Sequence, residues 1–336
     1  MNPVLANEHD WVVSETANTP YPITLTIFTD NDSAYYKPND DSDRQYTAGN
    51  GFAIDHQPIW ADRLAPHVPF ADTFGPATTG AGHFAFHLLH SPDNLRLRAP
   101  TPGDRPYSGH FNFGAFWQRV NAQRTSMDHF QVEMGFVGPS AAGEPIQKWI
   151  HRIFDAQEPM GWNNQLVDEL TFNLRIRKKW RALKHPADGP TTAARVDLIP
   201  QIGIDAGTVR SGLNAQITSR VGMNMPDDFG PANLFDFGDA TSHPPAGLGF
   251  CLFGSMAGSL VFHDLYLDGT VFRSSPITVD SSPLVGTFRF GTEVTYTDDA
   301  WSLAVGYSQT WLTEEFSTVS AHHSYSSWTM TLDIEF

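Results

Sequence analysis

Residues 170–180, LTFNLRIRKKW, alternate between apolar and polar side chains. Successive side chains of an extended strand point to opposite faces, so this spacing gives a strand one apolar and one polar face. The apolar face carries Leu170, Phe172, Leu174 and Ile176. The polar face carries Thr171, Asn173, Arg175 and Arg177. The same alternation recurs at residues 110–117 (HFNFGAFW), 129–138 (HFQVEMGFVG) and 330–336 (MTLDIEF).

The polar face of these strands is too polar for the interior of a soluble sandwich. Two arrangements remain: a soluble sheet with one hydrated face, or a membrane barrel with lipid outside and a hydrated lumen. The barrel better explains how many strands share the pattern. Aromatic residues near strand ends would then form the girdles at the two membrane interfaces. The candidates for these girdles are Trp60, Trp117, Trp180, Trp301, Trp311 and Trp328.

About twelve segments carry strand signals. They are residues 22–31, 46–60, 82–92, 107–120, 128–138, 168–183, 194–209, 211–224, 247–263, 282–298, 300–315 and 325–336. An even number allows a closed antiparallel barrel with both termini on one side. Longer connections alternate with short ones; the longer ones are residues 32–45, 93–106, 139–167 and 264–281. We therefore expect an all-β fold, a twelve-stranded antiparallel transmembrane β-barrel.

Residues 141–157 break the strand pattern. Ile146, Trp149, Ile150 and Ile153 recur at helical spacing, and Pro145 stands near the start, where proline is tolerated in a helix. We expect a short amphipathic helix there, in a loop outside the membrane. We expect a single domain over residues 1–336, with residues 1–20 as a periplasmic N-terminal segment.

The composition limits the classes of function. The net charge of −16 argues against binding to a phosphate backbone, so no nucleic-acid partner is expected. The only cysteine, Cys251, excludes an internal disulfide and any paired-cysteine metal site. No phosphate-binding loop, dinucleotide fingerprint or GxSxG elbow is present in the sequence.

Residues 29–51, TDNDSAYYKPNDDSDRQYTAGNG, contain a dense group of carboxylates. A calcium EF-hand is excluded, because counting from Asp41 the sixth position is Tyr46 rather than glycine. The middle of the segment is expected to be a solvated loop tip; it contains Asn39, Asp40, Asp41 and Asp43. Asn31 and Asp32 differ because they end a strand, where the backbone is fixed. They are the better candidates for holding a hard cation.

His151 is the candidate general base. On helical spacing it neighbours Gln147 and Asp155, so a carboxylate four residues away could reach its ring. A histidine in a structured loop can take a proton near neutral pH. A surface histidine with no catalytic role is the alternative from these residues alone.

Several motifs occur in a recognisable order along the chain. They are TDND (29–32), DRQYTAGN (43–50), GDRPYSG (103–109), GFVGPSAAGEPIQKWIHRIFDAQEPMGWNNQL (135–166), MPDDFGP (225–231) and LDGTVFR (267–273). Together they resemble the lipid A 3-O-deacylase (LpxR-like) family of outer-membrane proteins. The resemblance extends from about residue 24 to residue 336.

This resemblance implies a calcium-dependent barrel in the Gram-negative outer membrane, with its active site facing the outer leaflet. It would remove the 3-position acyloxyacyl chain from lipid A, with lipopolysaccharide and outer-membrane lipids as its partners. His151 would activate water, and Asn31, Asp32 and Thr47 match the family's calcium-site residues. A monomer is expected. Calcium and a basic side chain would stabilise the oxyanion.

The chain departs from the family pattern at two places. Gln157 stands where the family usually has a carboxylate, six residues after the histidine. The basic oxyanion residue belongs to the loop after the third strand, where the chain offers both Arg96 and Arg98. In the same loop, residues 103–106 (GDRP) are expected to be a structural anchor.

Three alternatives to the esterase remain at this stage. The first is a catalytically weakened barrel that binds lipopolysaccharide without cutting it, because of Gln157. The second is a small passive pore, in which inward-facing charges would pair and narrow the lumen. The third is a soluble β sandwich.

Overall fold

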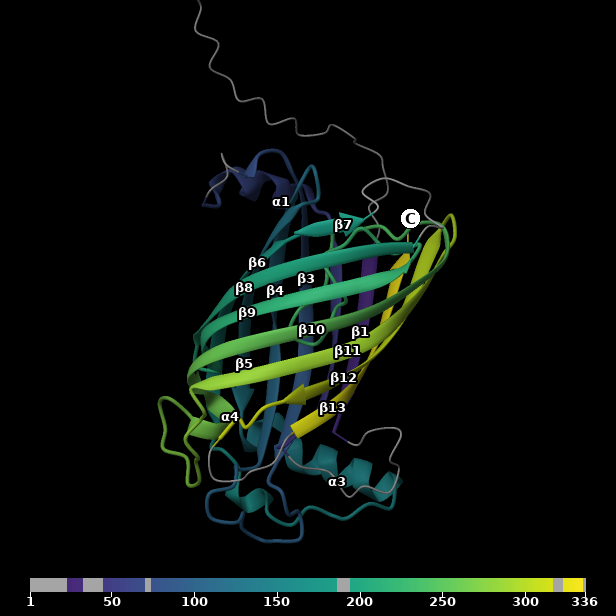
Figure 1. Cartoon of the computed structure of the whole chain (residues 1–336). Coiled ribbons are helices and arrows are strands. Elements are labelled where there is room, and N and C mark those ends of the chain that lie inside the picture. The colour runs from purple at the N-terminus through teal and green to yellow at the C-terminus, as the bar shows by residue number, and fades with distance from the viewer. Residues whose placement is uncertain (1–22, 33–44, 70–73, 186–193, 317–322, 335–336) are drawn as a thin grey trace, which may run out of the picture.

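The computed structural model describes residues 23–32, 45–69, 74–185, 194–316 and 323–334. These residues form one antiparallel sheet that closes on itself as a barrel, with helices at both ends (Figure 1). The expected N-terminal segment 1–20 and the acidic loop tip at 39–43 lie outside the described residues. No helix within the described ranges is both long and apolar enough to cross a membrane.

Strands make up most of the barrel. They are β1 (Ile23–Asn31), β2 (Gln45–His56), β3 (Ala77–Ser91), β4 (Ser108–Asn121), β5 (Ser126–Val137), β6 (Glu169–Trp180), β7 (Leu183–His185), β8 (Ala194–Gly207), β9 (Arg210–Met223), β10 (Gly247–Asp264), β11 (Leu284–Thr297), β12 (Trp301–Leu312) and β13 (His323–Ile334). The helices are α1 (Ile59–Leu64), α3 (Gly143–Ile153) and α4 (Leu265–Asp268). Single 3-10 turns are η1 (Ala65–His67), η2 (Pro139–Ala141) and η3 (Trp162–Asn164).

The barrel wall has twelve strands, as the sequence predicts, when β6 and β7 are counted as one. β7 is the continuation of β6, because both pair with β8: Lys179 lies opposite Gln201 and Leu183 opposite Leu198. The barrel closes where the first strand, β1, pairs with the last, β13, while the β6–β8 pairing continues the sheet past the short β7. Ile23 pairs with Ile334, so the first and last described residues lie at the same end. We call this the terminal end and the opposite one the α3 end.

The alternation seen in the sequence separates lipid-facing from lumen-facing side chains. In β6, Leu170, Phe172 and Leu174 are exposed on the outside. Asn173 and Arg175 point inward and are buried. The same division holds in β13, where Met330 and Ile334 are exposed. An apolar outer belt around a polar lumen is the arrangement that a barrel in lipid requires.

The connection between β9 and β10, residues 224–246, folds into the lumen and fills much of it. Its Leu234 and Phe237 pack against aromatic side chains on the inner wall of β1, β3 and β4. The Phe237 ring centroid lies 4.6 Å from that of Phe84 and 5.3 Å from that of Phe116. Gly80 permits this approach, since a Cβ there would lie 2.7 Å from the Ala240 Cβ. The lumen therefore contains a dry aromatic core.

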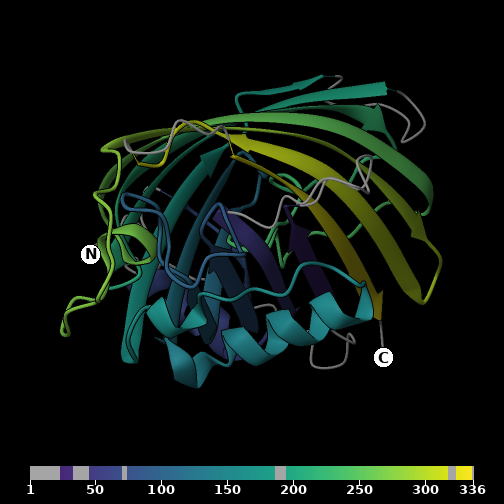
Figure 2. The ribbon, with the colours of Figure 1, turned by 90° about the horizontal axis from the view of Figure 1, so that it is seen from below.

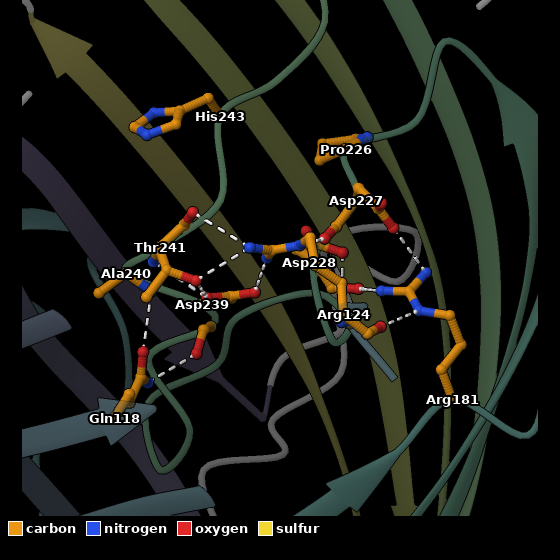
Figure 3. Close-up of polar contacts among 12 residues, drawn as sticks. Gln118, Arg124, Arg181, Pro226, Asp227, Asp228, Asp239, Ala240, Thr241 and His243 are labelled. Atoms are coloured by element: carbon orange, nitrogen blue, oxygen red, sulfur yellow. Dashed lines mark hydrogen bonds and ion pairs between the residues drawn. The ribbon is translucent and has the colours of Figure 1, made fainter. Parts of the chain in front are cut away.

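Ion pairs hold the rest of this connection to the wall (Figure 3). Arg124, from the β4–β5 turn, pairs with Asp239 and donates to the Asp227 carbonyl oxygen over 2.7 Å. Arg181 reaches the Asp227 carboxylate at 3.0 Å. Gln118 donates to the carbonyl oxygen of residue 238 at 2.8 Å. Each buried charge named here has an opposite charge or a hydrogen-bond acceptor beside it, as burial of charge requires.

Further ion pairs line the lumen side of the wall between neighbouring strands. Arg175 pairs with Glu133 and, at 3.3 Å, with Asp205, while Arg177 lies 2.7 Å from Asp205. A cavity of about 240 Å³ remains between these side chains and residues 229–236. Inward charges thus pair and narrow the lumen, as the sequence suggested.

The predicted strand boundaries agree with the structure to within about five residues, and in one segment a helix replaces part of the predicted strand. The segment predicted as a strand over 46–60 leaves the sheet at His56, and α1 begins at Ile59. Two of the expected girdle tryptophans are therefore placed differently. Trp60 lies in α1, and Trp117 is buried beneath α1, where its Nε1–H donates to the Ala61 carbonyl oxygen at 3.1 Å.

Candidate functional site

The ends of β1 and β2 bring three of the predicted site residues together at the α3 end. Asn31 lies opposite Ala48 in the register. The Asp32 N–H donates to the Thr47 carbonyl oxygen at 3.1 Å. Asp32 and Thr47 are both buried. The hairpin therefore brings the main chains of these three residues together, at the place where the sequence predicts a cation site.

A β-bulge places the Thr47 side chain. Tyr46 pairs with His90 of β3 and Ala48 with Leu89, so Thr47 is an extra residue between them. The bulge interrupts the alternation, and the side chains of Tyr46, Thr47 and Ala48 are all buried in succession. Bulges frequently redirect a side chain beside a functional site. Here the bulge lies at the residue that the resemblance assigned to calcium.

The Thr47 Oγ1 atom is buried and has no hydrogen-bond partner among the described residues. A buried hydroxyl without a partner costs free energy, so its presence needs an explanation. An oxygen ligand to a hard cation is such an explanation, because calcium binds hydroxyl, amide, carbonyl and carboxylate oxygens. The residues present thus fit a calcium ion, although no group of three or more His, Cys, Asp or Glu in the described part of the chain is arranged for a metal.

Helix α3 lies at the same end, fixed to β3 by the buried side chain of Gln147. Gln147 Nε2 donates to Ser91 Oγ at 3.0 Å, and Gln147 Oε1 accepts from Trp162 Nε1 at 2.9 Å. Ser91 lies opposite Gln45, the first residue of β2. The helix is therefore attached to the strand pair that carries Thr47.

Two glycines bring the start of α3 against β4. A Cβ on Gly109 would lie 2.8 Å from the Cα of Gly143, closer than real Cβ contacts. A Cβ on Gly143 would lie 2.6 Å from the Trp162 ring. The close backbone contact explains glycine at both positions. His87 Nε2–H adds a hydrogen bond of 2.7 Å to the Ala141 carbonyl oxygen.

A buried apolar cluster joins the same elements. Ala48 of β2 and Leu89 of β3 pack with Leu95, Tyr107 and Trp162, and Ile146 of α3 packs against them; this set is residues 48, 89, 95, 107, 146 and 162. The cluster lies beside the bulge on β2 and beneath α3. It therefore fixes the helix relative to the Thr47 region independently of the hydrogen bonds.

His151 lies on the buried side of α3, four residues after Gln147. Its Nδ1 atom is hydrogen-bonded to the main-chain carbonyl oxygen of Gln157. A carbonyl oxygen only accepts, so Nδ1 carries the proton, and in the neutral ring Nε2 is the nitrogen without a proton. This contact orients the ring and selects the tautomer in which Nε2 is the base.

Gln157 thus contacts His151 through its main chain. Its side-chain amide instead donates to the Glu158 carbonyl oxygen at 2.9 Å. Asp155, the carboxylate expected at helical spacing, lies beyond the helix, which ends at Ile153; it is exposed and has a positive φ of 51°. The partner of His151 Nδ1 is therefore a main-chain carbonyl oxygen, which the identity of the side chain does not predict.

Arg96 and Arg98 both lie in the loop between β3 and β4 and are exposed. The Arg96 N–H donates to Asn94 Oδ1 at 3.0 Å, and the Arg98 carbonyl oxygen accepts from Asn164 Nδ2 at 2.7 Å. These contacts order the main chain of the loop and leave the choice between the two guanidinium groups open.

The expected loop anchor is present nearby. Asp104 accepts from the N–H groups of Asp93 and Arg105, both at 2.8 Å. Burial raises the pKa of the Asp104 carboxyl above its ordinary value, and the two N–H donors oppose this rise. Arg105 is buried and pairs with Glu315 at 3.2 Å, so it holds the loop to the segment after β12.

Comparisons with known proteins identify the family and the fold. A family model described as "Outer membrane protein LpxR" matches residues 3–334. The chain belongs to the LpxR family. A search of curated proteins finds no match for it.

The barrel of this LpxR-family chain is similar to a solved structure of LpxR from Salmonella typhimurium, with a TM-score of 0.72 at 20% identity. That match covers 93% of this chain and all of the Salmonella chain. The β domain of the Bordetella autotransporter BrkA is also similar, with a TM-score of 0.47 at 10% identity over 95% of this chain and 100% of that one. The first likeness supports the closed outer-membrane barrel fold.

The sequence did not single out the residues that support the site of this LpxR-family protein. The sequence marks Gln147 only as a helical neighbour of His151, and it carries no signal for Ser91 or for the Gly109–Gly143 contact. Gln45 has a positive φ of 65° and a buried Nε2 without a partner among the described residues. The bulge at residues 46–48 is seen in the register and burial of β2 and has no sign in the residue pattern.

Proposed function

We propose that this protein is a calcium-dependent esterase of the Gram-negative outer membrane that removes the 3-position acyloxyacyl chain from lipid A. Family membership supports the substrate class and the location. The observation that carries the catalytic assignment is the hydrogen bond from His151 Nδ1 to the Gln157 carbonyl oxygen. It leaves Nε2 as a base on a helix docked beside the oxygens of β1 and β2.

The reaction follows from the chemistry of the imidazole. His151 Nε2 takes a proton from water, and the water oxygen bonds to the ester carbonyl carbon. The bond between that carbon and the 3-oxygen of the sugar then breaks. The proton on Nε2 passes to the departing sugar oxygen, and the released acyl chain is a carboxylic acid. The Gln157 carbonyl stabilises the protonated ring between these two transfers.

The cation site is proposed at Asn31, Asp32 and Thr47. A bound calcium ion would supply positive charge that stabilises the negative ester oxygen as water adds. Asp32 would contribute a carboxylate oxygen, Asn31 its amide oxygen, and Thr47 the hydroxyl that has no hydrogen-bond partner among the described residues. Arg96 and Arg98 are the candidates for a basic group at the same oxygen.

The α3 end is proposed to face the outer leaflet, where lipid A resides. Both described chain ends lie at the opposite end, which would face the periplasm. Three of the longer connections, residues 93–106, 139–167 and 264–281, lie at the α3 end, and α3 is in one of them (Figure 1). A monomer suffices for this arrangement, because every proposed site residue comes from one chain.

A second candidate is a barrel that binds lipopolysaccharide without cutting it. Gln157 favours this reading, because its side chain is neutral and turns to Glu158 instead of His151. The pore alternative is less well supported, since residues 224–246 occupy the lumen and the inward charges are paired.

Mass spectrometry of lipid A from cells producing the protein separates these functions. The esterase predicts loss of one acyloxyacyl group, and His151→Ala should abolish it while the barrel still folds. Arg152→Ala is the matched control, because Arg152 is the exposed neighbour on the same helix. Unmodified lipid A from cells with folded wild-type protein and calcium would favour the binding barrel instead.

A further inference from the structure

Helix α3 has an unusual distribution of side chains around its axis. Gly143, Gln147 and His151 follow one another at four-residue spacing and face the barrel. Gln147 and His151 are only 2% and 5% exposed. The buried face of this helix therefore carries two polar side chains: Gln147 is hydrogen-bonded to Ser91 of β3, and His151 to the Gln157 carbonyl oxygen in the loop after the helix.

The apolar side of α3 points away from the barrel. Trp149 is 62% exposed and Ile153 is 56% exposed, and both continue the line of Pro145 along the helix. Phe154, directly after the helix, is 76% exposed. Large apolar side chains at adjacent exposed positions normally mark a surface that is covered by a partner or by lipid.

A stripe of charged side chains runs along one side of the helix. Glu144, Lys148 and Arg152 lie between the buried and the apolar faces, and Lys148 Nζ lies 2.7 Å from Glu144 Oε1. A helix with a charged stripe beside an apolar stripe matches the boundary between water and lipid. The remaining face, which carries Gly143, Gln147 and His151, is packed against the protein.

Other exposed apolar side chains lie on the strand and loops next to α3. The outward side chains of β5 include Val132 and Met134, both exposed, and the strand ends at Val137 only six residues before α3 begins. Leu97 and Met160, on loops joined by the hydrogen bond from Met160 N to Leu95 O at 2.9 Å, add exposed apolar groups at the same end. Figure 2 shows α3 along one side of the rim, where lipid would meet it, and not across the opening.

We infer that α3 lies in the membrane interface, with Trp149, Ile153 and Phe154 inserted among the acyl chains of the leaflet. A lipid leaflet is the occupant that fits, because the apolar stripe lies next to exposed apolar side chains of the barrel and the charged stripe remains toward water. The helix of 11 residues is about 16 Å long, enough to lie along the rim.

This placement fixes the depth of His151. The ester bonds of a lipid lie where its head group meets the acyl layer, which is the level of an interfacial helix. His151 would therefore meet the ester from the side of the barrel, while Trp149 and Ile153 contact acyl chains. The placement of α3 itself does not depend on the catalytic assignment.

Site-specific fluorescence tests the inference. In a Cys251→Ala background, Ile153→Cys and Arg152→Cys would each carry an environment-sensitive label, in phosphatidylcholine vesicles containing lipid with a quencher near the top of the acyl chain. We expect at least threefold stronger lipid quenching for the label at 153 than at 152. Iodide in the water should give the opposite order. Equal quenching at the two positions, or stronger iodide quenching at 153, would overturn the inference.

A second pair guards against a variant that fails to fold. Trp149→Cys and Lys148→Cys sample the same two stripes one turn earlier, with the same expected order. The labels report depth whether or not lipid A is cleaved. A failed deacylase assay with the expected quenching would therefore refute the proposed function and leave the membrane position of α3 standing.

Discussion

Replacing Gln157 with alanine tests whether this residue acts on His151 through its main chain. The structure shows His151 Nδ1 bonded to the Gln157 carbonyl oxygen, which alanine retains. The side chain that alanine removes makes an exposed hydrogen bond to the neighbouring Glu158. We therefore expect the rate of lipid A deacylation by Gln157→Ala to stay within about twofold of wild type.

The alternative has a clear magnitude. A hydrogen bond to a charged partner contributes about 1.5–3 kcal/mol. If the Gln157 side chain stabilised the protonated ring, its loss would slow the reaction about 10- to 150-fold, at 1.36 kcal/mol for each factor of ten. The two expectations differ by enough for a single assay to distinguish them.

The assay is release of the acyloxyacyl group from lipid A by purified protein in detergent with calcium, followed by mass spectrometry. Gln157→Glu serves as the matched variant, since it restores the carboxylate that the family usually has while keeping the carbonyl. Both variants should keep rates of deacylation within about twofold of wild type. A loss of tenfold or more in Gln157→Ala, with α3 still resistant to protease, would refute a main-chain role.

Three further predictions concern the support of the site and of the barrel. Gln147→Leu removes two buried hydrogen bonds, each leaving a partner unsatisfied at about 1–3 kcal/mol, so α3 should become protease-sensitive and deacylation should fall at least tenfold. Asp197→Ala leaves buried arginines without their carboxylate and should lower the free energy of unfolding in urea by about 3–5 kcal/mol. Thr47→Val should keep the barrel's stability but raise the calcium concentration for half-maximal deacylation roughly tenfold.

Matched control variants separate these specific effects from general loss of stability. Lys148→Leu, on the exposed stripe of α3, should leave protease resistance unchanged, and equal sensitivity in both helix variants would contradict the docking role of Gln147. Asp299→Ala, in an exposed turn, should change stability by less than about 0.5 kcal/mol. A Thr47→Val protein with wild-type calcium dependence would remove Thr47 from the cation site.

The strands were predictable because a barrel wall meets lipid on one side and the lumen on the other. The contrast recurs at every second residue, so the alternation in LTFNLRIRKKW predicts strand β6 without any tertiary information. Helix α3 was predictable for the same reason, from apolar residues at helical spacing. Which way its apolar face points was not, because the pattern is identical for a helix that faces a core and one that faces lipid.

The lumen was harder to predict than the wall. Residues 224–246 show no periodicity, and their place inside the barrel depends on aromatic side chains of β1, β3 and β4 that are distant in sequence. Trp117 has the signature of a girdle residue, but α1 covers it. The strand predicted over residues 46–60 extends too far, into α1, because Ile59 and Trp60 prolong the apolar pattern.

The candidate site divides in the same way. His151 and the pair Asn31–Asp32 were found from residue type and a resemblance to a family. The bulge that buries Thr47 and the carbonyl that orients His151 are main-chain features, and side-chain identity encodes them weakly. Gln157 illustrates this: its amide differs from the family's carboxylate, while its carbonyl oxygen makes the contact.

The central claim is tested most directly by a calcium titration of lipid A deacylation with purified wild-type protein and its His151→Ala variant. The account predicts release of the 3-position acyloxyacyl group that rises with calcium, stops when a chelator is added, and is absent from His151→Ala at every calcium concentration. Release that persists in His151→Ala, or that is unchanged by the chelator, would contradict it.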